Sequence, residues 1–147
     1  MVDRVVVLRV GKHLLSMPFD HVDEILSTGR AVAGSDLPKG VASDDASASL
    51  WVSSRGRWLS VRELLPGQKM SDRSQILVVT CDGSTRAIIV DQVLGIERTG
   101  PLAPLPKVVE PYMEIPFAGV RFLKDRPVLE LDLSRLISVD IGGVPVG

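Results

Sequence analysis

Short apolar runs separated by turn signals occupy most of the chain. Residues 4–10, RVVVLRV, form a β-branched run. After a glycine, the next run places Leu15, Met17 and Phe19 on one side at a period of two. Two such runs around a glycine predict an antiparallel hairpin.

In the next segment, the spacing of apolar residues changes from the period of a strand to that of a helix. In DHVDEIL, residues 20–26, Asp20 can cap one helical turn. Three apolar residues would share one helical face: Val22, Ile25 and Leu26. Of these, Val22 and Ile25 are expected in the core. Residues 28–49 are small and polar with no periodicity, which predicts a long loop.

Strand patterns resume at LWVSS, residues 50–54, and RWLSVREL, residues 57–64, on either side of Arg55 and Gly56. In the second half, two Val- and Ile-rich runs flank a hairpin turn on Asp82-Gly83. Five prolines in residues 101–116 indicate an extended linker.

The end of the chain predicts one more hairpin, around Lys124 and Asp125, and a final helical turn over residues 134–137. The whole pattern gives eight to ten short strands and almost no long helix. It therefore predicts an all-β fold, either a small barrel or a sandwich.

The two halves of the chain also repeat each other. The pattern Asp20-x-Val22-x-x-Ile25 recurs 71 residues later as Asp91-x-Val93-x-x-Ile96. A second pattern recurs 69 residues later: Arg57, Leu59, Glu63 and Leu64 correspond to Arg126, Val128, Asp132 and Leu133. Because the order of hairpins and motifs is the same in both halves, we predict two related β-subdomains.

Length, charge and composition disfavour several classes of function. A chain of 147 residues is about one domain, and its formal charge of −1 gives no field that would attract nucleic acid. No apolar run approaches the roughly 18 residues of a membrane span, so no membrane insertion is expected. Charges at Asp3, Arg4 and Arg9 interrupt any signal peptide, and Cys81 is the only cysteine. We expect a reducing, cytoplasmic setting.

Catalytic motifs are missing from the sequence. No G-x-S-x-G, P-loop, H-E-x-x-H or C-x-x-C occurs, so no enzyme activity, metal or cofactor is predicted. Cys81 with His13 or His21 could form a nucleophile and base, but an inert thiol inside an apolar strand is far commoner. Asp91 and Asp132 are expected to be turn formers at strand ends.

Four motifs, in order, resemble the CheW-like family, the adaptor fold of bacterial chemotaxis arrays. V-x-E-[IV] is matched at residues 22–25, and N-L-R-G followed by an apolar strand is matched by SSRG…VREL, residues 53–64. The family's V-D-x-V is matched by VDQV, residues 90–93, and its closing motif by LELDLSRLI, residues 129–137. Several family residues are replaced here, by Leu50, Ser53, Ser54, Ser60 and Glu63.

The resemblance implies one CheW-like domain over residues 1–147, built of two five-stranded SH3-like barrels around a shared apolar core. The approximate subdomains would be residues 14–75 and the remainder, with exchange of strands between them left open. The implied function is a non-catalytic adaptor, located in the cytoplasm or at membrane-associated receptor arrays. It would couple the regulatory domain of a CheA-type histidine kinase to the cytoplasmic tips of chemoreceptors.

The resemblance also assigns partner contacts. Arg55 and Gly56 alone could be turn chemistry, but the matching turn of the second half has Lys124 and Asp125, which favours a partner role for the arginine. Trp58 is either exposed beside an arginine or packed under the other barrel. The full set of expected protein contacts is Val22, Glu24, Arg55, Gly56, Trp58, Val93 and Ile96.

Two other functions stay open at this point. The chain could be a degenerate adaptor with a different partner, serving localisation or motility control. It could instead be a β-barrel that binds a small molecule or catalyses a reaction, which would require an enclosed polar pocket.

Overall fold

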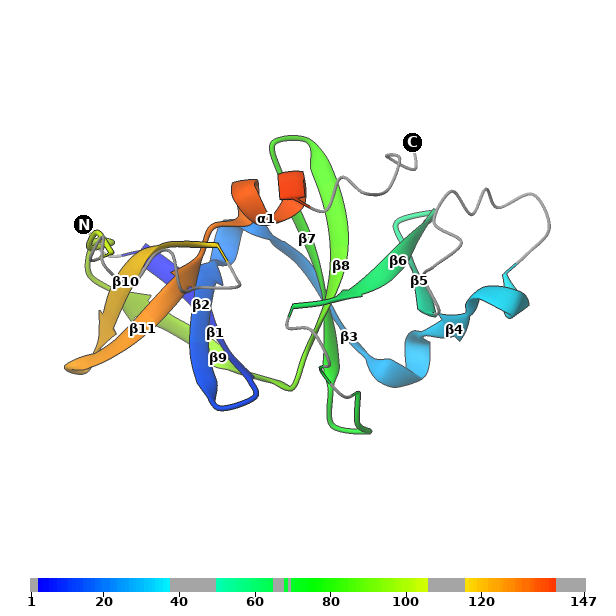
Figure 1. Cartoon of the computed structure of the whole chain (residues 1–147), viewed down its shortest axis with the longest axis horizontal. Helices are drawn as coiled ribbons and strands as arrows, with labels where there is room; N and C mark the ends of the chain where they lie inside the picture. Colours follow the sequence, from blue (N-terminus) through cyan, green and yellow to red (C-terminus); the bar gives the residue numbers. More distant parts are fainter. Residues whose placement is uncertain (1–2, 38–49, 65–67, 69, 106–115, 140–147) are drawn as a thin grey trace.

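A computed structural model describes residues 3–37, 50–64, 68, 70–105 and 116–139 of the chain. Within these ranges there are eleven strands, three short 3₁₀ turns and one α-helix (Figure 1). The strands are β1 (Asp3–Val10), β2 (His13–Pro18), β3 (Val22–Ser27), β4 (Val32–Ala33), β5 (Leu50–Ser54), β6 (Arg57–Glu63), β7 (Gln75–Cys81), β8 (Ser84–Val90), β9 (Gln92–Thr99), β10 (Phe117–Leu123) and β11 (Arg126–Leu131). The 3₁₀ turns are η1 (Phe19–His21), η2 (Thr28–Arg30) and η3 (Gly34–Asp36), and the helix is α1 (Leu133–Val139).

The strands form two curled sheets, one on each side of the molecule in Figure 1. The first sheet has the order β10-β11-β2-β1-β9, and the second has the order β3-β7-β8-β6-β5-β4. The all-β prediction is confirmed. The second sheet has six strands where five were expected, because the two-residue strand β4, which lies inside the predicted loop, pairs with β5.

The internal repeat is confirmed by the strand pairing. Each sheet contains an outer hairpin, a parallel contact, an inner hairpin and an edge strand, in that order. Individual pairs recur at the offset of 71: Val22 faces Val79 in the second sheet, and Val93 faces Leu8 in the first. Both edge strands also carry a bulge directly after this pair. The two halves therefore repeat in three dimensions as well as in sequence.

The repeated units exchange strands. Hairpin β1-β2 lies in the first sheet, whereas β3, the next strand of the same unit, lies in the second sheet. Hairpin β7-β8 lies in the second sheet, and β9 returns to the first. The expected subdomain of residues 14–75 begins within β2 of the first sheet and ends where β7 of the second sheet begins, so this division stays a prediction.

The predicted hairpin turns are confirmed by their backbone angles. Asp82 and Gly83 have φ angles of 53° and 81°, and Lys124 and Asp125 have φ angles of 48° and 68°. Two successive positive φ angles favour a tight two-residue hairpin, because the twist of such a turn matches that of the strands. The Arg55-Gly56 tip has the same form.

Three predictions of local structure need correction. The predicted helical turn over residues 20–26 is wrong, because β3 begins at Val22 and pairs along its length with β7. Asp20 makes no side-chain cap, and the side chain of Ile25 is 43% exposed instead of lying in the core. The secondary structure of this segment is determined by pairing with a strand some fifty residues away, so it could not be predicted from the local sequence pattern.

The described parts of the predicted loop and linker contain regular structure. Residues 28–37 contain η2, β4 and η3, and residues 38–49 lie outside the described residues. In the predicted linker, Ala103 forms a bridge with Val120 of β10, and residues 106–115 lie outside the described residues. The final turn predicted at residues 134–137 is a helix of seven residues, α1.

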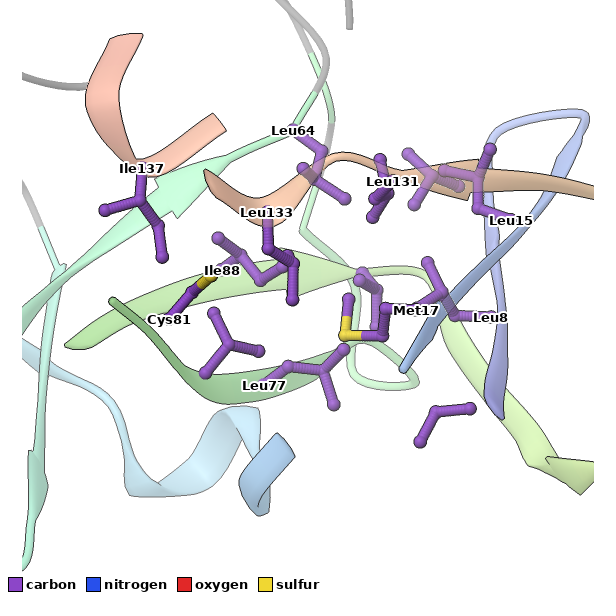
Figure 2. Close-up of a cluster of buried hydrophobic side chains, with 14 residues drawn as sticks. Leu8, Leu15, Met17, Leu64, Leu77, Cys81, Ile88, Leu131, Leu133 and Ile137 are labelled. Atoms are coloured by element: carbon purple, nitrogen blue, oxygen red, sulfur yellow. The ribbon is translucent and has the colours of Figure 1, made fainter. Parts of the chain in front are cut away.

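An apolar core lies between the two sheets (Figure 2). It takes Leu8 and Met17 from the first sheet and Leu77 and Ile88 from the second, while Leu133 and other residues of α1 pack beside them. The buried members are Val6, Leu8, Val10, Leu15, Met17, Leu64, Leu77, Val79, Cys81, Ile88, Val90, Leu131, Leu133 and Ile137. We refer to this set as the shared core. Its burial joins the two sheets into one unit.

Candidate protein-interaction surface

A bulge in β3 lies at the start of the candidate surface. Val22 faces Val79 of β7 and Glu24 faces Val78, so Asp23 is the extra residue between two consecutive pairs. A bulge changes the direction in which the neighbouring side chains project. In this protein the two acidic side chains at the bulge, Asp23 and Glu24, meet the tip of hairpin β5-β6.

Four side chains connect the bulge to that tip. Ser54 Oγ donates a hydrogen bond to Glu24 Oε1. Arg55 Nη1 lies 3.8 Å from Asp23 Oδ1, in an ion pair whose arginine side chain is 67% exposed and whose aspartate side chain is 20% exposed. The structure therefore brings together two predicted contacts that are distant in sequence, Glu24 and Arg55.

Further hydrogen bonds extend this group across β7 and β8. Thr80 Oγ1 donates to Asp23 Oδ2, and it lies 2.9 Å from Thr85 Oγ1. Arg57 Nη2 donates to Thr85 Oγ1 at 3.1 Å. Both arginines of the hairpin tip are thus connected to Asp23. We call Asp23, Glu24, Ser54, Arg55 and Arg57 the arginine-tip surface.

The other predicted contacts of the second sheet lie near this surface. Val22 precedes the bulge and packs half-buried against the shared core. Gly56 occupies the turn with a φ of 77°, next to Arg55. Trp58 faces Ser53 across the hairpin and is half-buried, while the adjacent Leu59 points into the second sheet's interior. The side chain of Trp58 is therefore neither freely exposed nor fully covered.

Val93 and Ile96 lie on β9, in the first sheet. Val93 is half-buried against the shared core, and its N–H donates to Gln75 Oε1 at 2.8 Å. Ile96 is 53% exposed, and its neighbour Leu94 is 47% exposed. We call Leu94 and Ile96 the β9 apolar edge. The structure thus divides the predicted contacts between two sheets.

The repeat relates these two regions. Ile25 is the equivalent of Ile96 at the offset of 71, and each faces a member of the shared core, Leu77 or Val6. The sequence interpretation missed the exposure of Ile25, although its own repeat aligned Ile25 with a predicted contact. It also missed Asp23 and Ser54, whose roles depend on contacts between strands that no local pattern reports.

Asp91, Asp132 and Cys81, three of the residues considered for catalysis, make structural contacts. Asp91 Oδ2 accepts a hydrogen bond from the Gly11 N–H at 2.6 Å, and Asp132 Oδ1 accepts one from the Arg135 N–H at 3.1 Å. Cys81 belongs to the shared core, where burial, followed by the charge of Asp82, raises the pKa of its thiol. A raised pKa disfavours the thiolate that a nucleophile requires.

Metal-binding groups and membrane-spanning helices are absent from the described residues. No group of three or more His, Cys, Asp or Glu side chains in these ranges has an arrangement that could hold a metal ion. None of the helices in the same ranges has the length and apolar character needed to cross a membrane.

Comparison with known proteins identifies what the chain is similar to. The model of the CheW-like domain matches residues 4–140. The structure is similar to the crystal structure of the scaffolding protein TtCheW from Thermoanaerobacter tengcongensis, with a TM-score of 0.68 and 18% sequence identity. That similarity covers 95% of this chain and 95% of TtCheW. A search of curated proteins gave no match.

Proposed function

Because the chain belongs to the CheW-like domain family, a family of chemotaxis scaffold proteins, we propose that it is a non-catalytic adaptor coupling a CheA-type histidine kinase to chemoreceptors. The proposed partners are the regulatory domain of the kinase and the cytoplasmic tip of the receptor. The proposed location is the cytoplasm, where membrane-associated receptor arrays present both partners.

The observation that carries this proposal is the exposed arginine at the tip of hairpin β5-β6. The equivalent turn of the first sheet has Lys124 and Asp125, with the same left-handed backbone angles. The fold therefore requires two residues with positive φ at this turn, but it does not require an arginine. A guanidinium offers a planar set of donors that suits a carboxylate or carbonyl group on a partner.

The environment of Arg55 also suits a binding role. Its only described ion pair is a long one, at 3.8 Å, and its side chain is 67% exposed. Asp23 is held in turn by Thr80, so the acid is oriented while the arginine stays accessible. Exposed ion pairs contribute little to stability, so this pair leaves the arginine free to exchange partners at small cost.

The β9 apolar edge supplies a surface of different chemistry in the other sheet. Leu94 and Ile96 expose 47% and 53% of their surface. One polar surface and one apolar surface on separate sheets would let two partners bind together. We assign the arginine-tip surface to the kinase side and the β9 apolar edge to the receptor side.

The test of the kinase assignment is calorimetry with the regulatory domain of a CheA-type histidine kinase from the same organism. Arg55→Ala should weaken binding at least about tenfold, as expected for an arginine at the centre of an interface. Lys124→Ala is the matched control, because Lys124 occupies the equivalent turn position with a φ of 48° against 51° for Arg55. Circular dichroism should show that both variants fold.

The outcomes separate the hypotheses. If Arg55→Ala and Lys124→Ala bind the kinase equally well, Arg55 is a turn residue and the assignment is wrong. If the wild-type chain binds neither a kinase nor a receptor fragment, the adaptor proposal with these partners fails. For the receptor side, Ile96→Ser should weaken binding, while Ile25→Ser, its equivalent in the second sheet, should leave receptor affinity unchanged.

A further inference from the structure

The two sheets have interiors of different chemistry. In the second sheet, Val52 and Val61 pack in an apolar cluster with the following residues: Leu26, Ala31, Leu59, Ile76, Val78 and Ala87. At the equivalent positions, 69 residues later, the first sheet has Arg121 and Glu130. Both are buried, and Ser16 replaces the equivalent Ala87 beside them. An ion pair therefore fills the space that valines fill in the other sheet.

The geometry of this ion pair is well formed. Arg121 Nε lies 2.9 Å from Glu130 Oε1, and Nη2 lies 3.3 Å from Glu130 Oε2, so the two side chains meet in a fork. Arg121 Nη1 donates to Asp3 Oδ2 at 2.6 Å and to the Gly100 carbonyl at 3.0 Å. The side chains of Arg121 and Glu130 are 7% and 4% exposed, and that of Asp3 is 44% exposed. We call Asp3, Arg121 and Glu130 the Arg121 latch.

Arg121 carries its charge in the folded protein. Burial by itself lowers the pKa of Arg121, but the hydrogen bonds to Glu130 and Asp3 raise it, and the net effect is a pKa above the ordinary value. The interior of the first sheet thus contains a desolvated cation and its counter-ions. Such a pair gains much less net free energy than its short contacts suggest, because both charges lose water.

The latch joins the two ends of the first sheet. Arg121 lies on β10, at one end of the strand order, and Gly100 directly follows β9, at the other end. Ala103 and Val120 form a backbone bridge at the same closure, and β10 also contacts β9 there. In the second sheet, the equivalent contact is the pairing of β4 with β5, which has two residue pairs, one of them between Val32 and Trp51. This pairing covers an apolar interior.

We propose that the Arg121 latch makes the first sheet the half of the molecule that opens locally, with hairpin β10-β11 separating from β1 and the end of β9 while the second sheet stays closed. A region opens at lower free energy where fewer apolar contacts must be broken. Outside the shared core, β1 and β11 bury Val5, Val7 and Val128, whereas the second sheet adds Val52 and Val61 where this sheet has the ion pair. On its other face, β11 stays anchored by Leu131 in the shared core. The hairpin would therefore swing about this anchor.

Hydrogen exchange of the full chain, followed by mass spectrometry at neutral pH, tests the proposal. The double substitution Arg121→Val with Glu130→Val copies the interior of the second sheet into the first. Amides of residues 117–131 should then exchange at least about tenfold more slowly, since replacing a buried ion pair by apolar residues is often stabilising. Amides of the equivalent hairpin, residues 50–63, should keep their rates. No slowing in 117–131 overturns the proposal, because the buried ion pair then does not set the free energy of opening. Equal slowing in both hairpins also overturns it, because the hairpin then opens only with the whole molecule.

A milder variant keeps the test decisive if the double variant does not fold. Asp3→Asn removes the half-exposed charge of the latch and retains the side-chain shape. It should speed exchange in residues 117–131 by roughly threefold to tenfold and leave 50–63 unchanged. The control is Asp125→Asn at the exposed tip of the same hairpin, which should change neither region. Wild-type exchange rates in Asp3→Asn would also overturn the proposal.

Discussion

Gly119 of β10 offers the sharpest test of how the first sheet closes. A methyl group placed on it would bring its carbon to 2.2 Å from the carbonyl oxygen of Ala103 and to 2.9 Å from two side-chain carbons of Leu102. The Leu102 side chain can rotate away, but a backbone oxygen cannot. Gly119→Ala must therefore push residues 102–103 away from β10.

The cost follows from the contacts at this place. Ala103 N–H donates to the Val120 carbonyl at 2.9 Å, and Val120 N–H donates to the Ala103 carbonyl at 2.8 Å. Losing both hydrogen bonds costs about 2 kcal/mol. Crowding in a packed site adds about 1–3 kcal/mol. We expect Gly119→Ala to lower the free energy of unfolding by about 3–5 kcal/mol.

Urea unfolding followed by circular dichroism measures this change, and thermal unfolding should show a Tm lower by about 10 °C or more. Gly100→Ala is the matched control, because a methyl group at Gly100 meets nothing within 4 Å. Both substitutions lower the conformational entropy of the unfolded chain by the same amount, so this effect on stability cancels when the two variants are compared. If the two variants unfold at the same urea concentration, the close approach of Gly119 to Ala103 does not constrain the sheet.

Three further predictions concern the shared core and its surroundings. Asp132→Ala should lower the free energy of unfolding by about 1 kcal/mol, because the carboxylate accepts a hydrogen bond from the Arg135 N–H in the first turn of α1; an unchanged urea midpoint would contradict this role. Met17→Ala should cost about 2–5 kcal/mol, because Met17 is fully buried in the shared core, and a smaller loss would show that the core collapses around the cavity. Because burial raises its pKa, Cys81 favours folding while the thiol is neutral. This contribution is lost as the pH rises above the ordinary thiol value of 9.0 and through the raised value. Unfolding titrations should therefore show a steeper alkaline loss of stability in the wild type than in Cys81→Ala, and identical pH profiles would refute the assignment.

The features that the sequence predicted correctly depend on near neighbours. The hairpin turn at Asp82-Gly83 is encoded by the two residues that adopt its positive φ angles. The helical turn predicted over residues 20–26 is wrong, because the strand found there, β3, depends on distant partners. A segment with Val22 and Ile25 fits a helical face or a strand equally, and pairing with β7 selects the strand.

The candidate surface shows the same division. The resemblance selected Glu24 and Arg55 separately, but no pattern could show that Glu24 binds Ser54 or that Arg55 pairs with Asp23, since these contacts cross between strands. The exposure of Ile25 could have been inferred from its repeat partner Ile96. The fold class was thus accessible from the sequence, while the arrangement of the surface required three-dimensional contacts.

The exchange of strands between the sheets has a consequence for the chain as a whole. Each sheet is completed by a hairpin from the opposite unit: β1-β2 joins β9-β10-β11, and β7-β8 joins β3, β5 and β6. This is the topology of a domain-swapped dimer whose two protomers have been fused into one polypeptide. A fragment that ends before β7 would lack the inner hairpin of its own sheet. The two halves should therefore reconstitute the fold only when both are present, as in fragment complementation.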